Sequence, residues 1–254
     1  MLFDTHTHLS EDKYDADREQ LIADLPKNNV GRVIDVGDEI EYSKKAVSLA
    51  NSHEIVYATV GVHPYSAKEM TEADIDILRE LAVNNKKVIG VGECGLDYHE
   101  NHYEYKAEQK IWFRKQIDLA QELDLPLIVH VRDAYEDCLE ILKEKNVSKG
   151  IIHCFSGTKE FMEEVCEMGF YVAFGGAMTY SNADDIREAA KFAPEDRILI
   201  ETDCPYLVPK GVKVSRNEPK FVAKAAEMLA EIRGVSIVDI EDVTWYNACK
   251  LFNL

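Results

Sequence analysis

The sequence predicts an α/β protein, and within that class a single (β/α)8 TIM barrel with an extra C-terminal helix. Short β-rich segments alternate with longer amphipathic segments along the whole chain, which is the pattern of parallel strands joined by helices. The length of 254 residues is typical of one such barrel. No linker rich in proline, glycine or serine interrupts the pattern. We therefore predict one domain over residues 1–254.

Eight strand segments follow one another in order. They are expected near residues 2–6, 31–36, 55–61, 88–93, 127–130, 150–154, 170–174 and 197–201. Helices are expected over residues 17–28, 40–51, 71–84, 105–123, 134–145, 159–167 and 184–192, most of them opened by Asp, Ser, Thr or Glu. A proline-bounded loop at 205–211 then precedes a helix over 219–232 and a last helix from about Ile237. An open, doubly wound sheet would show the same alternation, so the polar residues must decide between the two folds.

Composition restricts the classes of protein that fit. Hydrophobic residues make up 46% of the chain, enough for a large core, but no apolar run approaches the roughly 18 residues of a membrane span. A strand-like segment stands at residues 2–6, where a removable signal peptide would have its basic and apolar regions, so a cytoplasmic protein is expected. The six cysteines form no CxxC pattern, which favours reduced packing residues over disulfides or a thiolate zinc site.

The first strand carries half of a possible metal site. His6 and His8 stand two residues apart and therefore project to the same side of a strand. Further ionisable residues follow at the ends of later apolar strands. These are Glu93 on the fourth, His130 on the fifth, His153 on the sixth and Asp203 just past the eighth. Because chemistry gathers at the C-terminal ends of barrel strands, this placement favours the closed barrel over the open sheet.

Burying so many polar groups together without compensation would cost several kcal/mol each, and divalent metal ions offset that cost naturally. Six ligands exceed the need of one tetrahedral ion with an open position, so we predict two ions. In this prediction Glu93 bridges them, His6, His8 and Asp203 complete one, and His130 and His153 hold the other. Nitrogen and oxygen ligands without thiolate favour Zn, Mn, Fe or Co and also permit Mg.

Seven motifs spread over nearly the whole chain resemble those of the TatD family of metal-dependent deoxyribonucleases, a branch of the amidohydrolase-like barrels. They are Phe3-Asp4-Thr5-His6-Thr7-His8-Leu9, Gly61-Val62-His63-Pro64, Gly90-Val91-Gly92-Glu93-Cys94-Gly95-Leu96-Asp97-Tyr98, His130-Val131-Arg132-Asp133, His153-Cys154-Phe155-Ser156-Gly157, Glu201-Thr202-Asp203-Cys204-Pro205-Tyr206 and Arg216-Asn217-Glu218-Pro219. The resemblance implies a TIM barrel, two divalent metals and hydrolysis of phosphodiester bonds in DNA, typically from the 3′ end. The expected substrate is thus the end of a single or damaged strand.

Individual roles follow for the residues of these motifs. Two metal ions would lower the pKa of a shared water, so that hydroxide can attack phosphorus, with Asp203 as general base and Glu93 as the second catalytic carboxylate. The alternative is that Asp203 is only a ligand. Asp97 and Glu201 are expected behind the ligands, where they would orient imidazoles or Arg132.

Four residues are predicted to contact phosphate. His63 matches a family position that faces the substrate, with a structural hydrogen bond as the alternative. Arg132 lies two residues beyond His130 and its planar donor fork suits phosphate, although an ion pair with Asp97, Asp133 or Glu201 would also explain it. Arg216 and Asn217 lie in the loop after the eighth strand, a common phosphate-binding region of barrels.

Aromatic and histidine residues outside the ligand set have simpler interpretations. Tyr65, Tyr98 and Tyr206 could stack on a terminal base, with packing as the alternative. His53, His99 and His102 fall on helical or loop segments away from strand ends and are expected to be solvated.

Two other functions compete with the nuclease. The same metal-activated hydroxide attacks carbonyls, so an amide, ester or lactone hydrolase, including an aminoacyl-tRNA deacylase, is the alternative enzyme. A non-enzymatic module that captures phosphate ends is the third candidate, but the complete ligand set argues against it. The formal charge of −18 opposes wrapping of duplex DNA, and we expect only short-range contact with a strand end. No obligate protein partner is evident, so a monomer is expected.

Overall fold

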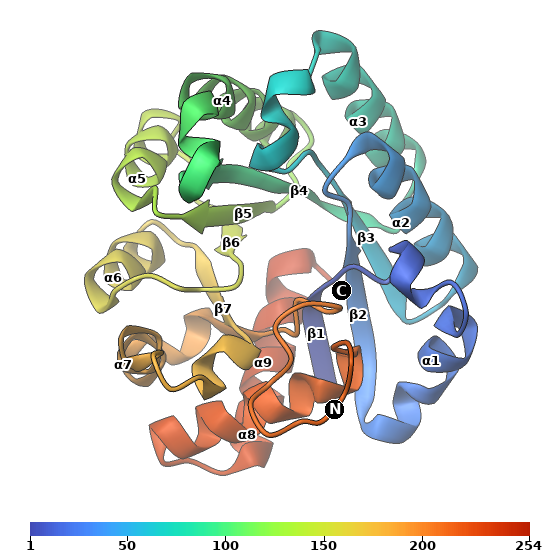
Figure 1. Cartoon of the computed structure of the whole chain (residues 1–254), viewed down its shortest axis with the longest axis vertical. Coiled ribbons are helices and arrows are strands. Elements are labelled where there is room, and N and C mark those ends of the chain that lie inside the picture. The colour runs from blue at the N-terminus through green and yellow to red at the C-terminus, as the bar shows by residue number, and fades with distance from the viewer.

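The structure is a computed structural model, and it describes the side chains of residues 1–100, 102 and 104–254. In this described part, eight strands form one parallel sheet in which each strand lies beside the next along the chain (Figure 1). They are β1 (Leu2–Thr7), β2 (Val30–Val36), β3 (Val56–Val60), β4 (Val88–Asp97), β5 (Leu127–Arg132), β6 (Gly150–Ile152), β7 (Tyr171–Phe174) and β8 (Ile198–Ile200). An isolated parallel bridge between Thr7 and Cys204 joins β1 to the segment after β8, so the sheet closes into the predicted barrel.

Helices surround the barrel and connect its strands (Figure 1). The α-helices are α1 (Arg18–Asp24), α2 (Ile40–Ser52), α3 (Glu72–Asn84), α4 (Lys106–Glu122), α5 (Tyr135–Glu144), α6 (Lys159–Glu167), α7 (Asp184–Phe192), α8 (Val222–Arg233) and α9 (Ile237–Phe252). Short 3-10 helices are η1 (Asp12–Tyr14), η2 (Pro26–Asn28), η3 (Pro64–Glu69), η4 (Glu100–Tyr105), η5 (Gly176–Thr179), η6 (Glu195–Arg197) and η7 (Pro219–Phe221).

Two helices are shorter than the sequence predicted, and a proline accounts for each. The helix expected over 17–28 ends at Asp24, because Pro26 lacks the N–H that an interior helical residue donates and instead opens the 3-10 helix η2. The helix expected from Pro219 begins at Val222, after the 3-10 turn η7. The strands β4 and β5 run further than predicted, to Asp97 and Arg132.

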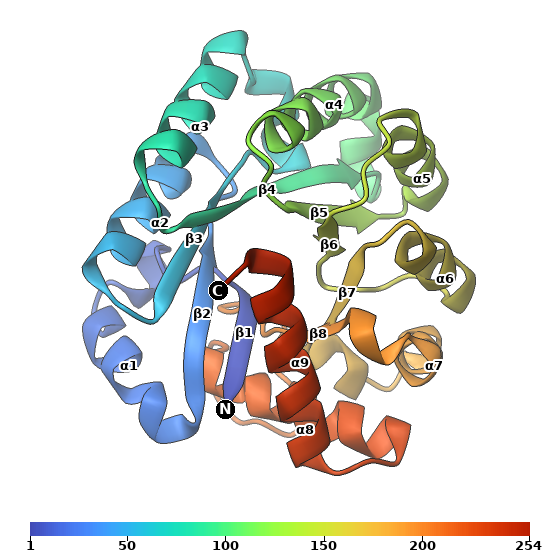
Figure 2. The ribbon, with the colours of Figure 1, turned by 180° about the vertical axis from the view of Figure 1, so that it is seen from behind.

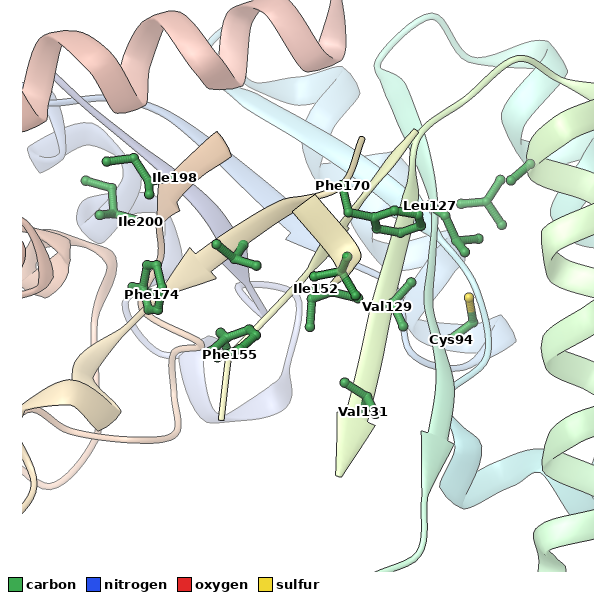
Figure 3. Close-up of a cluster of buried hydrophobic side chains, with 14 of the residues drawn as sticks. Cys94, Leu127, Val129, Val131, Ile152, Phe155, Phe170, Phe174, Ile198 and Ile200 are labelled. Carbon is green, nitrogen blue, oxygen red and sulfur yellow. The ribbon is translucent and has the colours of Figure 1, made fainter. Parts of the chain in front are cut away.

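Apolar side chains fill two layers of the molecule. The larger cluster lies between the strands and the surrounding helices. Figure 3 shows part of it, with Cys94 of β4, Leu127, Val129 and Val131 of β5, Ile152 of β6, Phe155, Phe170, Phe174 of β7, and Ile198 and Ile200 of β8. The smaller cluster contains the residues that alternate along each strand with those of the larger one, among them Ile128 of β5, Ile151 of β6 and Leu199 of β8. Since side chains alternate along a strand, these residues point into the barrel.

The extra C-terminal helix α9 covers the end of the barrel at which the strands begin (Figure 2). Ala248, Leu251 and Phe252 of α9 join the inner cluster, and Phe252 lies 6.4 Å from Phe3 of β1 between ring centroids. This end is therefore filled with apolar side chains. Polar side chains can gather only at the opposite end, where the strands finish.

Among the helices that the described residues form, none has the length and apolar character required to cross a membrane.

Candidate metal centre

The first ligand group consists of His6, His8 and Asp203, at the junction of β1 with the segment after β8. The Nε2 atoms of His6 and His8 lie 3.2 Å apart, and Asp203 Oδ1 is 3.8 Å from the former and 3.5 Å from the latter. Backbone hydrogen bonds fix this junction: Asp203 N–H donates to the His6 carbonyl at 3.0 Å, and His8 N–H donates to the Cys204 carbonyl at 2.8 Å. Main-chain pairing thus brings together residues that are almost two hundred positions apart.

A buried carboxylate, Asp4, strengthens the same junction. Its Oδ1 accepts backbone N–H groups from His6 at 3.3 Å and Thr202 at 2.9 Å, and its Oδ2 accepts the Thr202 hydroxyl at 2.6 Å. Burial raises the pKa of Asp4 well above its ordinary value, although these hydrogen bonds oppose the shift. Sequence reasoning did not assign Asp4 a role. The signal was an aspartate in a predicted strand, which must find partners where the strand is buried.

Glu93 lies between the first group and a second one. Its Oε2 is 3.2 Å from His6 Nε2 and 3.7 Å from His8 Nε2, whereas its Oε1 is turned to the other side of the site. Burial alone would raise the pKa of Glu93, but the surrounding histidines outweigh it and hold that pKa well below the ordinary value. The carboxylate is thus ionised and presents one oxygen to each group.

Local irregularity of β4 gives Glu93 this position. The sequence placed it at the end of the fourth strand, but β4 continues to Asp97 and its pairing with β5 shifts register between Val91 and Cys94. Glu93 N–H donates to the Gly37 carbonyl at 2.9 Å. The preceding Gly92 has a φ of 134°, and a Cβ there would lie 2.4 Å from the Ile128 carbonyl oxygen, so only glycine fits.

The second ligand group consists of His63, His130 and His153. Glu93 Oε1 lies 2.8 Å from His153 Nε2, 3.0 Å from His130 Nδ1 and 3.4 Å from His63 Nε2. Alternation explains two of these positions, because His130 follows Ile128 on the inner face of β5 and His153 follows Ile151 at the end of β6. His63, predicted to face the substrate phosphate, lies after β3 with its Nε2 in this group.

Carboxylates stand behind the two histidines that β5 and β6 provide. Asp97 Oδ2 is 3.0 Å from His130 Nε2, and Glu201 Oε1 is 3.7 Å from His153 Nδ1. Burial would raise the pKa of Asp97, but the hydrogen bond with His130 outweighs it, and that pKa is about 2. Burial raises the pKa of Glu201 to about 7. Such partners orient a ligating imidazole and increase its basicity.

These donor atoms fit divalent cations. The ligand atoms of His6, His8 and Asp203 all lie within 4.8 Å of one another, and so do those of His63, Glu93 and His130. Two pairs of ring nitrogens face each other at 3.2 Å, one pair in each group, an arrangement in which lone pairs converge. Imidazole nitrogens with carboxylate oxygens suit Zn, Mn, Fe or Co, and also permit Mg.

His8 illustrates how the pocket favours positive charge. Its Nδ1 lies 3.2 Å from the Val36 carbonyl, which can only accept, so Nδ1 holds the proton and Nε2 is free to bind an ion. Burial would lower the pKa of His8, but Asp203 and the other nearby carboxylates outweigh it and raise that pKa to about 10. A bound cation would satisfy the same carboxylates. Asp38, which sequence reasoning missed, is one of them: it follows β2 and its buried Oδ1 has no hydrogen-bond partner among the described residues.

Arg132 lies at the end of β5 with its side chain exposed. It forms no ion pair with a carboxylate in the described part of the chain. Its three alternative partners are engaged elsewhere: Asp97 with His130, Asp133 with His99, and Glu201 with the backbone N–H of Cys154. The guanidinium is therefore available to a ligand.

The structure does not bring Arg216 or Asn217 to the centre. Arg216 donates to the Lys13 carbonyl and to Asp17, and its guanidinium lies 4.4 Å from the Tyr14 ring centroid. Asn217 is fully buried, and its side-chain amide donates to the carbonyls of Thr202 at 3.0 Å and Leu207 at 3.3 Å. Both side chains hold the loop after β8 in place. Loop position alone suggested phosphate contact, and it does not report where a side chain points.

The aromatic residues near the rim also differ from one another. Tyr65 and Tyr206 are exposed at the two sides of the centre, whereas Tyr98 is buried and donates its hydroxyl to Asp137 at 2.7 Å. The expectation that His102 is solvated was wrong, because its ring stacks on Tyr65 and its Nδ1 lies 3.4 Å from Asp97 Oδ1. Its sequence neighbours gave no sign of this, since the contact depends on η3 and η4 meeting in space.

Comparison with known proteins gives one consistent family. A family model described as TatD related DNase matches residues 3–253. An uncharacterized metal-dependent hydrolase, YabD of Bacillus subtilis, is 42% identical over 256 residues, covering 100% of both chains. The 3′-5′ ssDNA/RNA exonuclease TatD of Cronobacter sakazakii is 33% identical over 258 residues, covering 99% of this chain and 97% of the relative.

A solved structure agrees with these sequence relatives. The crystal structure of YjjV, a TatD homolog from Escherichia coli K12, superposes with a TM-score of 0.94 at 27% sequence identity. The match covers 100% of this chain and 98% of that one. The barrel and its extra helix are therefore shared across their whole length.

Proposed function

Because the chain belongs to the family of TatD-related DNases and is a metal-dependent hydrolase, we propose that it hydrolyses phosphodiester bonds at the ends of single-stranded DNA, as a 3′-5′ exonuclease. The observation that carries the proposal is the division of the Glu93 carboxylate between two ligand groups. Paired metal sites that share a bridging carboxylate suit phosphoryl chemistry, in which an attacking and a leaving oxygen both develop charge.

The residues present would hold two divalent ions. His6, His8 and Asp203 would bind one, His130 and His153 the other, and Glu93 both. When bound, such ions lower the pKa of a water molecule toward neutrality and offset the charge of a phosphate. Glu93 and Asp203, the two carboxylates among the ligands, supply −2 against the +4 of two divalent ions, so the loaded ligand sphere would attract a phosphate even though the chain carries a formal charge of −18.

The chain's own groups would then position the substrate and move the proton. Asp203 has a pKa below its ordinary value, because its hydrogen bond with His8 outweighs burial, so it is ionised and can accept a proton from water. Its side chain is 15% exposed, which leaves it accessible from the rim. Arg132 has no carboxylate partner in the described part of the chain and would offer its guanidinium to a phosphate oxygen. His63 has an Nε2 directed at the same space and would contact the phosphate beside it.

A strand end is the substrate form that fits the charge of the protein. A surface that tracks along duplex DNA carries an excess of Lys and Arg, whereas this chain has 47 acidic and 29 basic residues. Contact is therefore confined to the nucleotides nearest the centre.

The test is an exonuclease assay on single-stranded DNA labelled in its 3′-terminal nucleotide, with Mg, Mn, Zn, Fe and Co compared separately. We expect stepwise release of 5′-mononucleotides by the wild type and its loss in His6→Ala. The matched control is His53→Ala, which removes a histidine whose nearest ionic partner is Glu19 on the surface.

Parallel substrates separate the competing functions. The same preparation is given a duplex, an RNA strand, an aminoacyl ester and a lactone. If no ion supports release of nucleotides while a metal-dependent ester or lactone hydrolysis appears, the nuclease proposal is wrong and the carbonyl hydrolase replaces it.

A further inference from the structure

An exposed tyrosine stands beside the second ligand group. Tyr65 lies two residues after His63, in η3, and 44% of its surface is accessible. Its ring meets the His63 ring edge to face at 4.3 Å between centroids, and its backbone N–H donates to His63 Nδ1 at 3.1 Å. A large aromatic side chain left open to solvent beside His63, the residue proposed to contact phosphate, calls for an explanation, because packing alone would bury it.

The ring of Tyr65 is already stacked on one side. The His102 ring lies 3.9 Å from it between centroids, at an interplanar angle of 28°. His102 in turn lies beside Asp97, whose Oδ1 is 3.4 Å from its Nδ1 without a hydrogen bond and whose Oδ2 is 3.0 Å from His130 Nε2. The same carboxylate thus borders both a predicted metal ligand and the aromatic pair.

The other exposed tyrosine at the rim differs in what surrounds it. Tyr206 is equally exposed, at 44%, and lies against His8 of the first group. The Lys13 ammonium lies 4.3 Å from its ring centroid, however, and its hydroxyl donates to Glu11. A cation therefore occupies one face of Tyr206, whereas Tyr65 has another aromatic ring there, and the hydroxyl of Tyr65 interacts with Asp97 and with the Arg132 guanidinium.

Proteins hold single-stranded nucleic acid with exposed aromatic rings and with arginines whose charge no carboxylate neutralises, and Arg132, which contacts the Tyr65 hydroxyl, is such an arginine among the described residues. Every base has a π-face, so stacking on a tyrosine tolerates any sequence, while the guanidinium takes the phosphate. On the basis of the proposed nuclease function, we propose that the Tyr65–His102 pair is a stacking platform for the nucleobase adjoining the bond that is cut, with Arg132 on that nucleotide's phosphate.

In this proposal the aromatic pair binds the base and the metal centre with Arg132 binds the phosphate. Substrate would approach on the side of η3 and η4, and its terminal base would be recognised as an aromatic surface and not by its hydrogen-bonding edge. A strand end that lacks the base should therefore be cut more slowly, and the penalty should depend on the ring of Tyr65.

The experiment combines one variant with one substrate change. Oligonucleotides carry either a normal nucleotide or a tetrahydrofuran abasic residue on one or the other side of the scissile bond, and kcat/KM is measured for wild type, Tyr65→Leu and Tyr65→Trp. The wild type should prefer the normal nucleotide by about 5- to 100-fold at one of the two positions. Tyr65→Leu should bring that ratio close to one, and Tyr65→Trp should keep it.

The control variant is Tyr246→Leu, which makes the same substitution at a tyrosine 63% exposed on α9, at the other end of the barrel. It should keep the wild-type ratio. If Tyr65→Leu cuts DNA and keeps the full preference for the normal nucleotide, the platform is refuted and the nuclease function stands. If the wild type releases no nucleotide from the normal strand, the proposed function itself fails and the platform with it.

Discussion

The two ligand groups are held in place by different means. In the first group, main-chain hydrogen bonds between β1 and the segment after β8 fix His6, His8 and Asp203, and the neutral carbonyl of Val36 orients the His8 ring. In the second group, the carboxylates of Asp97 and Glu201 stand behind His130 and His153. Main-chain pairing also positions His130 and His153. The groups therefore differ in what lies behind their imidazole rings, a neutral carbonyl in the first and carboxylates in the second.

Exposure differs in the same direction. The His6 and His8 side chains are 0% and 7% exposed, whereas those of His63 and His130 are 12% and 17% exposed. Asp203, at 15%, and His153, at 3%, are the exceptions. A group buried in the barrel junction is rigid and shielded, and one at the rim can exchange its ligand and receive substrate. We infer that the first site holds its ion tightly and that the second one is the more easily changed by mutation.

The largest effect is expected where the two groups meet. Glu93→Gln preserves size but removes the charge and leaves one acceptor oxygen in place of two, so both sites should lose affinity. We expect kcat/KM on single-stranded DNA to fall by about a thousandfold or more, which corresponds to the loss of several kcal/mol of transition-state stabilisation. Metal content after dialysis should fall from two ions per chain toward none. Glu163→Gln, at an exposed glutamate of α6, is the matched control.

Removal of the metals should occur in two steps, because the two groups are expected to bind their ions with different affinity. With ion present at a hundred times its dissociation constant, binding stabilises the folded state by about 2.7 kcal/mol, which raises Tm by roughly 5 to 10 °C for a chain of this size. During titration with a chelator, followed by metal analysis and thermal melting, the ion of the more exposed second group should leave first. Loss of both ions in a single step would contradict the difference between the groups.

Support by charge can be tested at Asp97. Asp97→Asn removes the carboxylate behind His130, and loss of such a partner lowers metal affinity or activity by about 10- to 100-fold. Calorimetric titration should show one weakened site and one unchanged site. Asp76→Asn, at an exposed aspartate of α3, should change neither. Equal weakening of both sites would mean that the groups are not held independently.

The smallest effect is expected at Asp137 of α5, which packs outside the barrel and contacts none of the ligands that the structure describes. Asp137 of α5 accepts the Tyr98 hydroxyl at 2.7 Å and pairs with Lys106 at 2.8 Å and Lys110 at 2.7 Å. Burial opposes its ionisation, but the lysines outweigh it and hold the pKa of Asp137 well below the ordinary value of 3.8. Asp137→Asn should therefore lower the free energy of unfolding by about 1 kcal/mol at pH 7.

The pH dependence of that difference has a definite sign. A carboxylate whose pKa is lower in the folded state stabilises the fold fully above the unfolded-state value and loses that contribution as the pH falls toward the folded-state value. Urea denaturation of wild type and Asp137→Asn should give a difference in stability that is constant at neutral pH, begins to shrink below about pH 4 and disappears as the pH approaches the folded-state pKa. A difference that stays constant down to the lowest pH at which both proteins fold would mean that packing and not charge is responsible.

The alternating strands and helices and the extra helix could be predicted from periodicity, which is local in the sequence, and the closed barrel from the ionisable residues placed at the ends of the strands. His130 and His153 were placed correctly on their strands for the same reason, since alternation with Ile128 and Ile151 directs them inward. The extension of β4 beyond Glu93 was not predicted, because its bulge depends on the backbone contact with Gly37.

Side-chain contacts between distant segments were the part that sequence patterns did not reveal. Arg216 is directed to Asp17, and His102 is stacked on Tyr65, through approaches of loops that no periodicity records. Asp4 was visible as an aspartate in a predicted strand, but its partner Thr202 is 198 positions away along the chain.

The junction of β1 with the segment after β8 also determines when the centre can form during synthesis. His63, Glu93, His130 and His153 have all been translated once the ribosome passes residue 153, so the second group and its bridging carboxylate exist in a chain little more than half made. The first group is incomplete without Asp203. The strand β1, which carries His6, also packs through Phe3 against Phe252 of α9. A nascent chain can therefore hold at most the more exposed of the two sites, and the paired centre appears only when translation is almost finished.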